Sequence, residues 1–543
     1  MERPQMADAC NVLMIFPRFN PKSFWSYEGA CELFGAKYPA APLGMITLAA
    51  MLPKSWSVRL VNRNTEELED GDLAWADLVM TGGMLAQQFD TLKVIELVQR
   101  AGKPVAVGGP DPTSSPQVYA AADFRVVGEA EGVIDEFIAA WRRGERRGLF
   151  EALKFQADVT KSPTPRFDLL KLKQYMYIGV QFSRGCPFLC EFCDIIELYG
   201  RAPRTKAPAQ MLAELDALYA LGYRGHVDFV DDNLIGNKKA VKEFLPHLIA
   251  WQKKHNYPFQ LSTEASLNLS DDAQMLQMLR EANFFTVFIG IETPDEETLI
   301  LTQKKQNTRR SIPESVKRIY DAGIFVIAGF IVGFDTEKDD VVNATVGCIE
   351  DAAIPVTVLS LLYALPNTQL TRRLKAEGRL HEEVAFDAKG RAGDLCLAGL
   401  NFDTLRPRGE ILRDYLDVVS RIYDPDMFFG RVQRVIRSLD PVHLGMKIML
   451  RDWWREFDRF LRIMWRVTRY RPEMRRHVWA ILIECMAKRP RAVRAAMVLT
   501  VFYISLGPFS RYVIEQVKAE LARLDPAEPI PAALSAPAVA TAA

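Results

Sequence analysis

Three of the chain's eight cysteines, Cys186, Cys190 and Cys193, lie within eight consecutive positions in the spacing C-x3-C-x2-C. A strand-like apolar run, 177–182, leads directly into them, which predicts one short loop carrying three thiols. Three thiolates can bind three irons of a cubane cluster and leave the fourth iron open, whereas a structural zinc site needs four protein ligands. No fourth cysteine lies nearby, and the nearest histidine, His226, is outside finger spacing. The spacing favours a cluster with an open iron, and zinc is the alternative.

The cysteine segment resembles the signature of the radical SAM (S-adenosylmethionine) superfamily, which has the same spacing and an aromatic residue just before the last cysteine. Phe192 occupies that position. The resemblance implies that a 4Fe–4S cluster on Cys186, Cys190 and Cys193 binds the amino and carboxylate groups of SAM at its open iron. It also implies that an electron from the cluster cleaves SAM to a 5′-deoxyadenosyl radical, and that Phe192 lies at the SAM site.

Length and composition indicate a globular chain of several domains. With 543 residues it is too long for one hydrophobic core and suggests about three domains. The scattered remaining cysteines do not form a disulfide framework, which favours a reducing, cytoplasmic environment. Residues 1–9 show no signal-peptide pattern, and no window reaches the roughly 18 uninterrupted apolar residues of a spanning helix. We therefore expect a soluble or peripheral protein.

Residues 10–145 alternate short apolar runs with helix-like segments, which predicts a Rossmann-like α/β domain with a parallel sheet. Three successive predicted strands end in glycines, which let backbone N–H groups approach a phosphate or amide at the carboxyl edge of the sheet. A tight strand-to-helix turn explains each glycine equally well, but their common position favours a ligand site. No G-x-G-x-x-G follows the first strand, which argues against a dinucleotide.

Because it precedes the radical SAM motif, this block resembles the cobalamin-binding domain of the B12-dependent radical SAM enzymes. The D-x-H-x-x-G motif that supplies a histidine to cobalt in many cobalamin proteins is missing, and the first histidine in the chain is His226. A cobalamin bound here would have no imidazole ligand from this domain, which is compatible with methyl transfer. The resemblance implies cobalamin contacts at Gly44, Gly82, Gly83, Gly108, Gly109, Gly128 and Glu129.

The charged, proline-broken segment 146–172 predicts a linker, and six strand–helix units in 173–390 predict a partial (β/α)6 barrel. Carboxylates stand at three successive strand ends, where packing does not require them. Each can be a buried ion pair or can meet a ligand. The radical SAM resemblance implies that the strand ends contact SAM, with the following candidates in addition to Phe192: Asp231, Asp232, Glu264, Glu292, Gly329, Val332 and Tyr363.

Basic residues flank the cysteine loop on both sides. Arg184, Arg201 and Arg204 can hold the SAM carboxylate, can raise the potential of the cluster, or can form a solvated basic face. The polar segment 304–308 after the fourth barrel strand predicts an exposed loop.

Residues 391–524 read as a helical domain, and 525–543 as a disordered Ala/Pro-rich tail. The segment 431–494 is rich in arginine and poor in acids. Its aromatic stripe either packs on the barrel or rests on anionic lipid, and no nucleic-acid-binding module is present. The stripe comprises Trp453, Trp454, Phe457, Phe460, Leu461, Met464 and Trp465. The region resembles the C-terminal extension of a set of bacterial B12-binding radical SAM proteins that includes hopanoid C-2 methylases.

Together these features predict a cobalamin-dependent radical SAM methyltransferase that acts on an unactivated carbon of a hydrophobic substrate, such as a hopanoid or other isoprenoid. A flavodoxin- or ferredoxin-type reductant is expected. The enzyme would be cytoplasmic, with peripheral contact at the inner face of an anionic membrane and no nucleic-acid partner. Two alternatives remain: radical rearrangement or ring closure without methyl transfer, and a non-catalytic cobalamin or iron–sulfur sensor or carrier.

Overall fold

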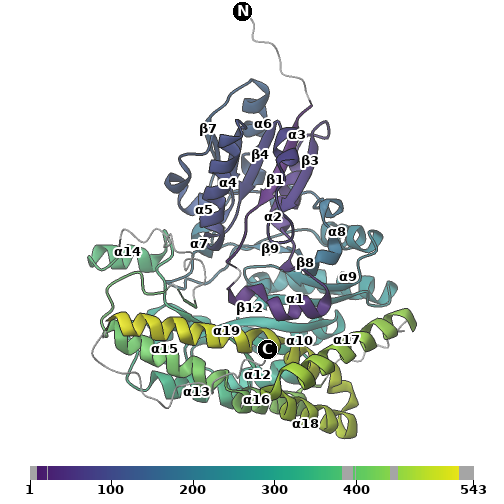
Figure 1. The fold of residues 1–543 in the computed structure, drawn as a ribbon, viewed down its shortest axis with the longest axis vertical. Helices are drawn as coiled ribbons and strands as arrows, with labels where there is room; N and C mark the ends of the chain where they lie inside the picture. The colour runs from purple at the N-terminus through teal and green to yellow at the C-terminus, as the bar shows by residue number, and fades with distance from the viewer. Residues whose placement is uncertain (1–8, 21, 382–395, 398, 441–449, 525–543) are drawn as a thin grey trace, which may run out of the picture.

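The computed structural model describes residues 9–20, 22–381, 396–397, 399–440 and 450–524. Figure 1 shows an N-terminal α/β unit at one end, a second α/β unit in the middle, and helices of the C-terminal region covering that second unit. The predicted tail, 525–543, lies outside the described residues. The α/β fold class with a helical C-terminal region is confirmed.

The N-terminal unit is a parallel six-stranded sheet in the order β3-β1-β4-β5-β6-β7. Its two faces are covered by different helices, because both faces of the central strands are apolar. Val12 and Met14 face α2 and α6, whereas Leu13 and Ile15 face α4. The elements are β1 (Asn11–Phe16), β3 (Ser57–Asn62), β4 (Leu78–Gly82), β5 (Val105–Gly108), β6 (Phe124–Val127), β7 (Gly148–Glu151), α2 (Leu43–Met51), α3 (Asp70–Trp75), α4 (Gln88–Arg100), α5 (Pro110–Ser114) and α6 (Ile134–Arg142).

The second unit is a parallel seven-stranded sheet in the order β15-β14-β13-β12-β11-β8-β2. Its edge strands, β2 and β15, do not pair with each other, so the barrel is open, as expected for six βα units. The strands are β2 (Tyr38–Ala40), β8 (Tyr175–Val180), β11 (Gly225–Phe229), β12 (Phe259–Ala265), β13 (Phe284–Glu292), β14 (Phe325–Val332) and β15 (Val356–Leu361). The helices are α8 (Pro208–Ala220), α9 (Lys238–Lys254), α10 (Ala273–Glu281), α11 (Glu296–Leu301), α12 (Ile312–Asp321), α13 (Val341–Asp351) and α14 (Gln369–Ala376).

Two strands correct the boundaries expected from the sequence. β7 lies inside the expected linker 146–172 but pairs with β6, so the first sheet extends beyond residue 145. β2 lies inside the expected first domain but pairs with β8 of the barrel. Both are short edge strands with little continuous apolar sequence, and only their partners in space identify them.

The C-terminal helices pack against the barrel and against the segment before β2. Helix α19 contacts α15 and also α1 (Glu28–Phe34), where the ring of Tyr27 lies 5.6 Å from that of Phe502. These helices are α15 (Arg408–Ile422), α16 (Pro425–Ser438), α17 (Leu450–Tyr470), α18 (Pro472–Lys488) and α19 (Val493–Leu524).

Helix α19 is longer than its uninterrupted apolar run indicates, because it continues through Pro508. By length and composition alone, Pro490–Leu524 could cross a membrane, contrary to the expectation from the sequence. However, 56% of its most apolar window is buried inside the protein, as in the core helix of a globular domain.

Gly82→Ala is expected to destabilise the N-terminal sheet. Gly82 has φ of +154°, and a Cβ there would lie 1.8 Å from the carbonyl oxygen of Gly108, a backbone atom that cannot move aside. We expect a loss of about 1–3 kcal/mol, seen as a lower urea midpoint. The control is Gly44→Ala in α2, where a Cβ meets nothing within 4 Å and helix propensity favours alanine. Equal midpoints for the two variants would contradict this close approach of β4 and β5.

Candidate functional site

The cysteine loop begins where β8 ends and is closed by a short antiparallel pair, β9 (Ser183–Arg184) with β10 (Arg204–Thr205). Gly185 has φ of +98°, and a Cβ there would lie 2.9 Å from the carbonyl oxygen of Gly200, so this turn requires glycine. The backbone N–H of Cys186 donates to that same carbonyl at 3.2 Å. The three cysteines are therefore presented by one tightly folded loop.

The two aspartates after β11 bind the backbone at the entrance of this loop. Asp231 is buried and accepts hydrogen bonds from the backbone N–H groups of Phe182 and Ser183, and from the Ser183 hydroxyl at 2.5 Å. Asp232 accepts from the N–H of Gly185 at 2.8 Å. Burial raises the pKa of Asp231 to about 7 and that of Asp232 to about 6, although these hydrogen bonds lower both pKa values. Both aspartates therefore support the loop through these hydrogen bonds, and the predicted contacts of Asp231 and Asp232 with SAM stay a prediction.

Two amide side chains point N–H groups at cysteine sulfurs. Nδ2 of Asn233 lies 3.9 Å from Sγ of Cys186, and Nε2 of Gln306 lies 3.5 Å from Sγ of Cys190. The amide oxygens of Gln306 and Asn307 are buried and have no partner among the described residues. Unpaired buried oxygens beside the cysteines indicate that a donor from a ligand can bind there.

The segment after α11 is not the exposed loop that the sequence predicted. Lys304 is 8% exposed, and its Nζ lies 2.5 Å from Oε1 of Glu292. Its ammonium also lies 5.8 Å from the centre of the Phe192 ring. Burial opposes the charged form, but Glu292 and the thiols of Cys190 and Cys193 raise the pKa of Lys304. A buried cation therefore lies beside the cysteine loop. The sequence did not indicate this, because the polar residues around Lys304 are typical of an exposed loop.

Glu264, at the end of β12, differs from the other strand-end carboxylates. Its side chain is exposed and has no hydrogen-bond partner among the described residues. Burial within the protein, followed by the nearby charges of Asp228, Asp232 and Asp231, nevertheless raises its pKa to about 8. With this raised pKa, the carboxyl is largely protonated at neutral pH and can donate a hydrogen bond.

Two further SAM candidates, Gly329 and Val332, lie on β14, and Tyr363 follows β15. A Cβ on Gly329 would be 3.1 Å from the Phe288 ring, so glycine allows this aromatic side chain to lie against the strand. The side chain of Val332 is buried in the core, and its backbone carbonyl accepts from the N–H of Leu362. Tyr363 is buried, and burial together with the charge of Asp111 raises its pKa to about 12. Asp111 belongs to the N-terminal unit, so the two units meet at this point.

The glycine-rich turns of the N-terminal sheet pack against one another. Gly82 approaches Gly108, and a Cβ on Gly109 would lie 3.2 Å from the N of Gly83. Close packing of neighbouring strand ends accounts for these glycines without a ligand. At the same edge, Oδ1 of Asp111 is buried and has no partner among the described residues, which is an observation that glycine packing does not explain.

Similar packing surrounds the other turns predicted to contact cobalamin. A Cβ on Gly83 would meet the side chain of Gln87, and one on Gly128 would lie 2.9 Å from Cβ of Ala152. Gly44 lies in α2 with open space around it. Whether these turns contact a cofactor stays a prediction.

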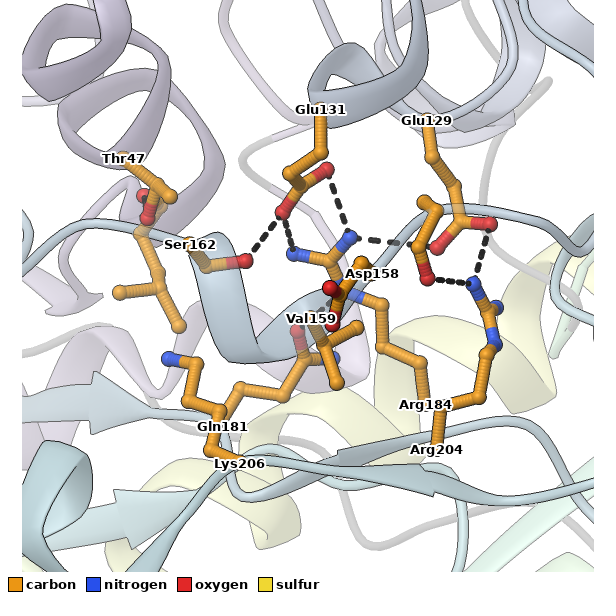
Figure 2. A network of polar contacts seen from close by, with 12 residues as sticks. Thr47, Glu129, Glu131, Asp158, Val159, Ser162, Gln181, Arg184, Arg204 and Lys206 are labelled. Carbon is orange, nitrogen blue, oxygen red and sulfur yellow. Dashed lines mark hydrogen bonds and ion pairs between the residues drawn. The ribbon is translucent and has the colours of Figure 1, made fainter.

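A buried network of ion pairs joins the N-terminal unit to the cysteine loop (Figure 2). Arg184 donates to Glu131 at 2.7 and 2.9 Å and to Glu129 at 3.2 Å. Arg204 donates to the other oxygen of Glu129 at 2.8 Å, and Ser162 donates to Glu131 at 2.6 Å. Arg184 and Arg204 are therefore ion-paired and do not form a solvated face, and the Glu129 carboxylate accepts from both arginines.

The network fixes the charge of its members. Burial would raise the pKa of Glu131, but hydrogen bonds and charge from Arg184, with help from Ser162, outweigh it and lower the pKa to about 2. The side chains are 14% exposed for Arg184 and 7% for Glu131, so this pair is shielded from water and salt. Because Arg184 directly precedes Gly185, the N-terminal unit holds the first residues of the cysteine loop.

Comparison with known proteins gives the family. Residues 180–348 match the Radical SAM superfamily, and residues 368–519 match a domain of unknown function, DUF4070. The chain is 47% identical to the uncharacterized methyltransferase sll1242 of Synechocystis over 430 residues, 79% of each chain. It is 37% identical to the hopanoid C-2 methylase of Rhodopseudomonas palustris over 427 residues, 77% of this chain and 78% of that one. The chain belongs to the radical SAM superfamily.

Solved radical SAM structures share its fold. The cobalamin-dependent enzyme OxsB, with aqua-cobalamin bound, has a TM-score of 0.58 at 14% identity, over 95% of this chain and 81% of that one. The methyltransferase TsrM of Kitasatospora setae, with cobalamin and a 4Fe–4S cluster bound, has a TM-score of 0.53 at 17% identity, over 68% and 78% of the two chains.

The radical SAM assignment implies a 4Fe–4S cluster and SAM, and the cysteine loop fits both. Among the described residues, no group of three or more His, Cys, Asp or Glu side chains is placed to hold a single metal ion. A cubane cluster spreads its thiolates over three irons and does not need such a single-ion site. The N–H donors at Cys186 and Cys190, and the buried amide oxygens beside them, suit a cluster and a bound amine.

Gln306→Leu is expected to lower the midpoint potential of the reconstituted radical SAM cluster while iron content stays unchanged. An N–H donor to a ligand sulfur stabilises the reduced, more negative cluster. A hydrogen bond worth about 1 kcal/mol corresponds to roughly 40 mV for one electron. The readout is an EPR-monitored redox titration. The control is Gln303→Leu, because Gln303 lies in the same segment as Gln306 but donates its hydrogen bond to Gln369 and not to a cysteine. An unchanged potential in Gln306→Leu would rule out this contact.

Arg184→Gln is expected to cost about 3–5 kcal/mol at neutral pH, because it leaves Glu131 buried without its cation. The cost should shrink as pH falls from 4.5, the ordinary value for Glu131, through the folded pKa of about 2, since the stabilising charge is then lost from the wild type as well. Denaturant titration over this range measures it. The control is Arg166→Gln, which breaks an exposed pair with Asp168 and should cost less than about 1 kcal/mol. Equal losses would contradict the shielding.

Proposed function

We propose that this radical SAM enzyme is a cobalamin-dependent methyltransferase that acts on an unactivated carbon of a hydrophobic substrate, with hopanoids or other isoprenoids as the preferred class. One observation carries the proposal. The carboxyl edge of the N-terminal sheet and the cysteine loop are bound together by the buried Glu129, Glu131, Arg184 and Arg204 network. A ligand at that edge and a cluster on the loop would therefore face one shared space.

The chain's own residues hold and shield this space. When bound, the cluster and SAM supply hydrogen abstraction, and cobalamin supplies the methyl group. Asp231 and Asp232 fix the backbone of the loop, and Lys304 with Glu292 places a balanced ion pair beside it. The unpaired amide oxygen of Asn307 is available to accept from the amino group of SAM.

Cobalamin fits the N-terminal edge in two respects. The unpaired Oδ1 of the buried Asp111 can accept a hydrogen bond from an amide side chain of the corrin. The first histidine of the chain, His226, lies in barrel strand β11, so no imidazole of the N-terminal unit competes for cobalt. The predicted contacts at Gly44, Gly82, Gly83, Gly108, Gly109 and Gly128 are part of this proposal.

Aromatic side chains over the barrel support a hydrophobic substrate. The Trp25 ring lies 6.1 Å from that of Phe288, which lies against Gly329 inside the sheet. Phe24 contacts Phe509 of α19, so the segment before β2 and the last helix form an apolar cover. We further infer a cytoplasmic enzyme that works in peripheral contact with the inner membrane face, reduced by a flavodoxin- or ferredoxin-type donor.

The decisive experiment measures both cofactors and both products. Protein reconstituted anaerobically with iron, sulfide and hydroxocobalamin is desalted, assayed for iron and cobalt, and incubated with methyl-labelled SAM, a reductant and a micellar hopanoid. We expect retention of both metals, formation of 5′-deoxyadenosine, and labelled methyl in the hopanoid. Cys190→Ala should lose iron and both products but keep cobalt. Cys348→Ala, a half-buried cysteine on α13, is the control.

Other outcomes overturn parts of the proposal. Deoxyadenosine without labelled product indicates rearrangement or ring closure and refutes methyl transfer. Iron without cobalt refutes cobalamin at the N-terminal edge. Intact SAM that is bound but not cleaved under strong reductant indicates a sensor or carrier.

A further inference from the structure

Helices α17 and α18 form a hairpin on the side of the molecule away from the N-terminal unit (Figure 1). A single residue, Arg471, links them, so the helices run antiparallel. Their inner faces are fully packed: Val467 and Val478 are at most 2% exposed. Met464, predicted in an aromatic stripe, also points inward at 6% exposed. The core thus uses one face of each helix and leaves the other face outward.

The outward faces are apolar as well. On α17, Leu461 is 50% and Trp465 61% exposed, four residues apart. On α18, Ile483 is 58% exposed, also four residues from Trp479. The indole N–H of Trp479 donates to the hydroxyl of Thr468 at 3.2 Å, so the row on α18 begins against the last turns of α17. We call this surface the hairpin face; it comprises Phe457, Leu461, Trp465, Tyr470, Trp479, Ile483 and Met486. The side chains of Trp453 and Trp454 lie outside the described residues.

A soluble protein seldom exposes two adjacent apolar rows without a partner for them. No other described element covers the hairpin face, since its members remain exposed in the folded chain. An amphipathic helix needs only its inner row for stability, so the outer row requires a separate explanation.

The charge around the hairpin face identifies the partner. Residues 457–491 contain ten Lys or Arg and three Asp or Glu. All three acids pair with arginines: Asp458 with Arg462, Glu473 with Arg471, and Glu484 with Arg437 of α16. Ten basic and three acidic residues leave the segment with an excess of seven positive charges. The exposed basic side chains on these helices include Arg469, Arg475, Lys488 and Arg491. Arg462, Arg476 and Arg489 are exposed as well, but they bind Asp458, Asp426 and backbone carbonyls of α16 and Leu439, respectively.

A second copy of the chain is a poor occupant, because a twofold contact would bring two strongly basic surfaces together. An anionic bilayer offers both requirements: apolar depth for Leu461 and Ile483, and phosphates for the arginines. Trp465, Trp479 and Tyr470 are the residue types that favour the level of the lipid headgroups.

We propose that the hairpin face docks the enzyme on the surface of an anionic lipid bilayer. Its apolar rows enter the headgroup region and its flanking Lys and Arg side chains bind lipid phosphates. The inference names the surface behind the peripheral membrane contact in the proposed function, on which it rests; it does not depend on which reaction the enzyme catalyses.

The test is co-sedimentation of the reconstituted holoenzyme with vesicles made of equal parts phosphatidylcholine and phosphatidylglycerol, compared with phosphatidylcholine alone. Wild type should bind the anionic vesicles, and added salt should weaken binding. The double variant Leu461→Ser/Ile483→Ser should bind at least about tenfold more weakly, because it removes two large apolar side chains from the contact. The control Leu153→Ser/Leu221→Ser makes the same change at leucines 71% and 46% exposed elsewhere, and should bind like wild type.

Each outcome has one meaning. Iron content and deoxyadenosine formation, measured without vesicles, should match wild type in both double variants and show that they fold. Equal vesicle binding by Leu461→Ser/Ile483→Ser and wild type overturns the docking surface and leaves methyl transfer untouched. Self-association of wild type that this variant abolishes, without lipid binding, overturns it in favour of a dimer contact. Loss of vesicle binding in the variant, in a protein that transfers no methyl group, supports docking and refutes the proposed reaction.

Discussion

Arg184 and Arg204 stand on the two short strands that close the cysteine loop, and the carboxylates that neutralise them come from the turn after β6 in the N-terminal unit. Separating these shielded charges would cost free energy, because each unit would be left with charged side chains that have lost their partners. The relative position of the two α/β units is therefore set at the point where the cysteines begin. A chemistry that needs two cofactors at a fixed separation depends on such a constraint.

The polar residues of the barrel around this network have different roles. Asp231 and Asp232 bind the loop backbone, while Asn233 and Gln306 turn N–H groups toward sulfur. Among the predicted strand-end carboxylates Asp231, Asp232, Glu264 and Glu292, only Glu264 is exposed and has no hydrogen-bond partner among the described residues. Carboxylates that bind the loop backbone and a carboxylate without a protein partner thus come from the same strand ends, and position along the chain does not distinguish them.

The prediction from sequence succeeded where local pattern determines structure. The cysteine spacing and Phe192 identified the radical SAM motif, and apolar runs located the six main barrel strands. It failed where a residue's role depends on a partner distant in sequence. The sequence places Lys304 in an exposed loop, but the structure buries it in an ion pair with Glu292. The sequence places β2 in the first domain, but β2 pairs with β8 of the barrel.

By itself, the sequence determined the cysteine motif, the alternation of strands and helices, the missing N-terminal histidine and the basic, aromatic character of the C-terminal region. These are properties of short segments, because spacing, periodicity and composition act through neighbouring residues. Only the tertiary structure decided that Arg184 and Arg204 bind Glu129 and Glu131, that glycines at neighbouring strand ends pack on one another, and which face of α17 and α18 remains outward. Those outcomes depend on which distant surfaces meet, since burial and charge neutralisation are determined by the whole fold.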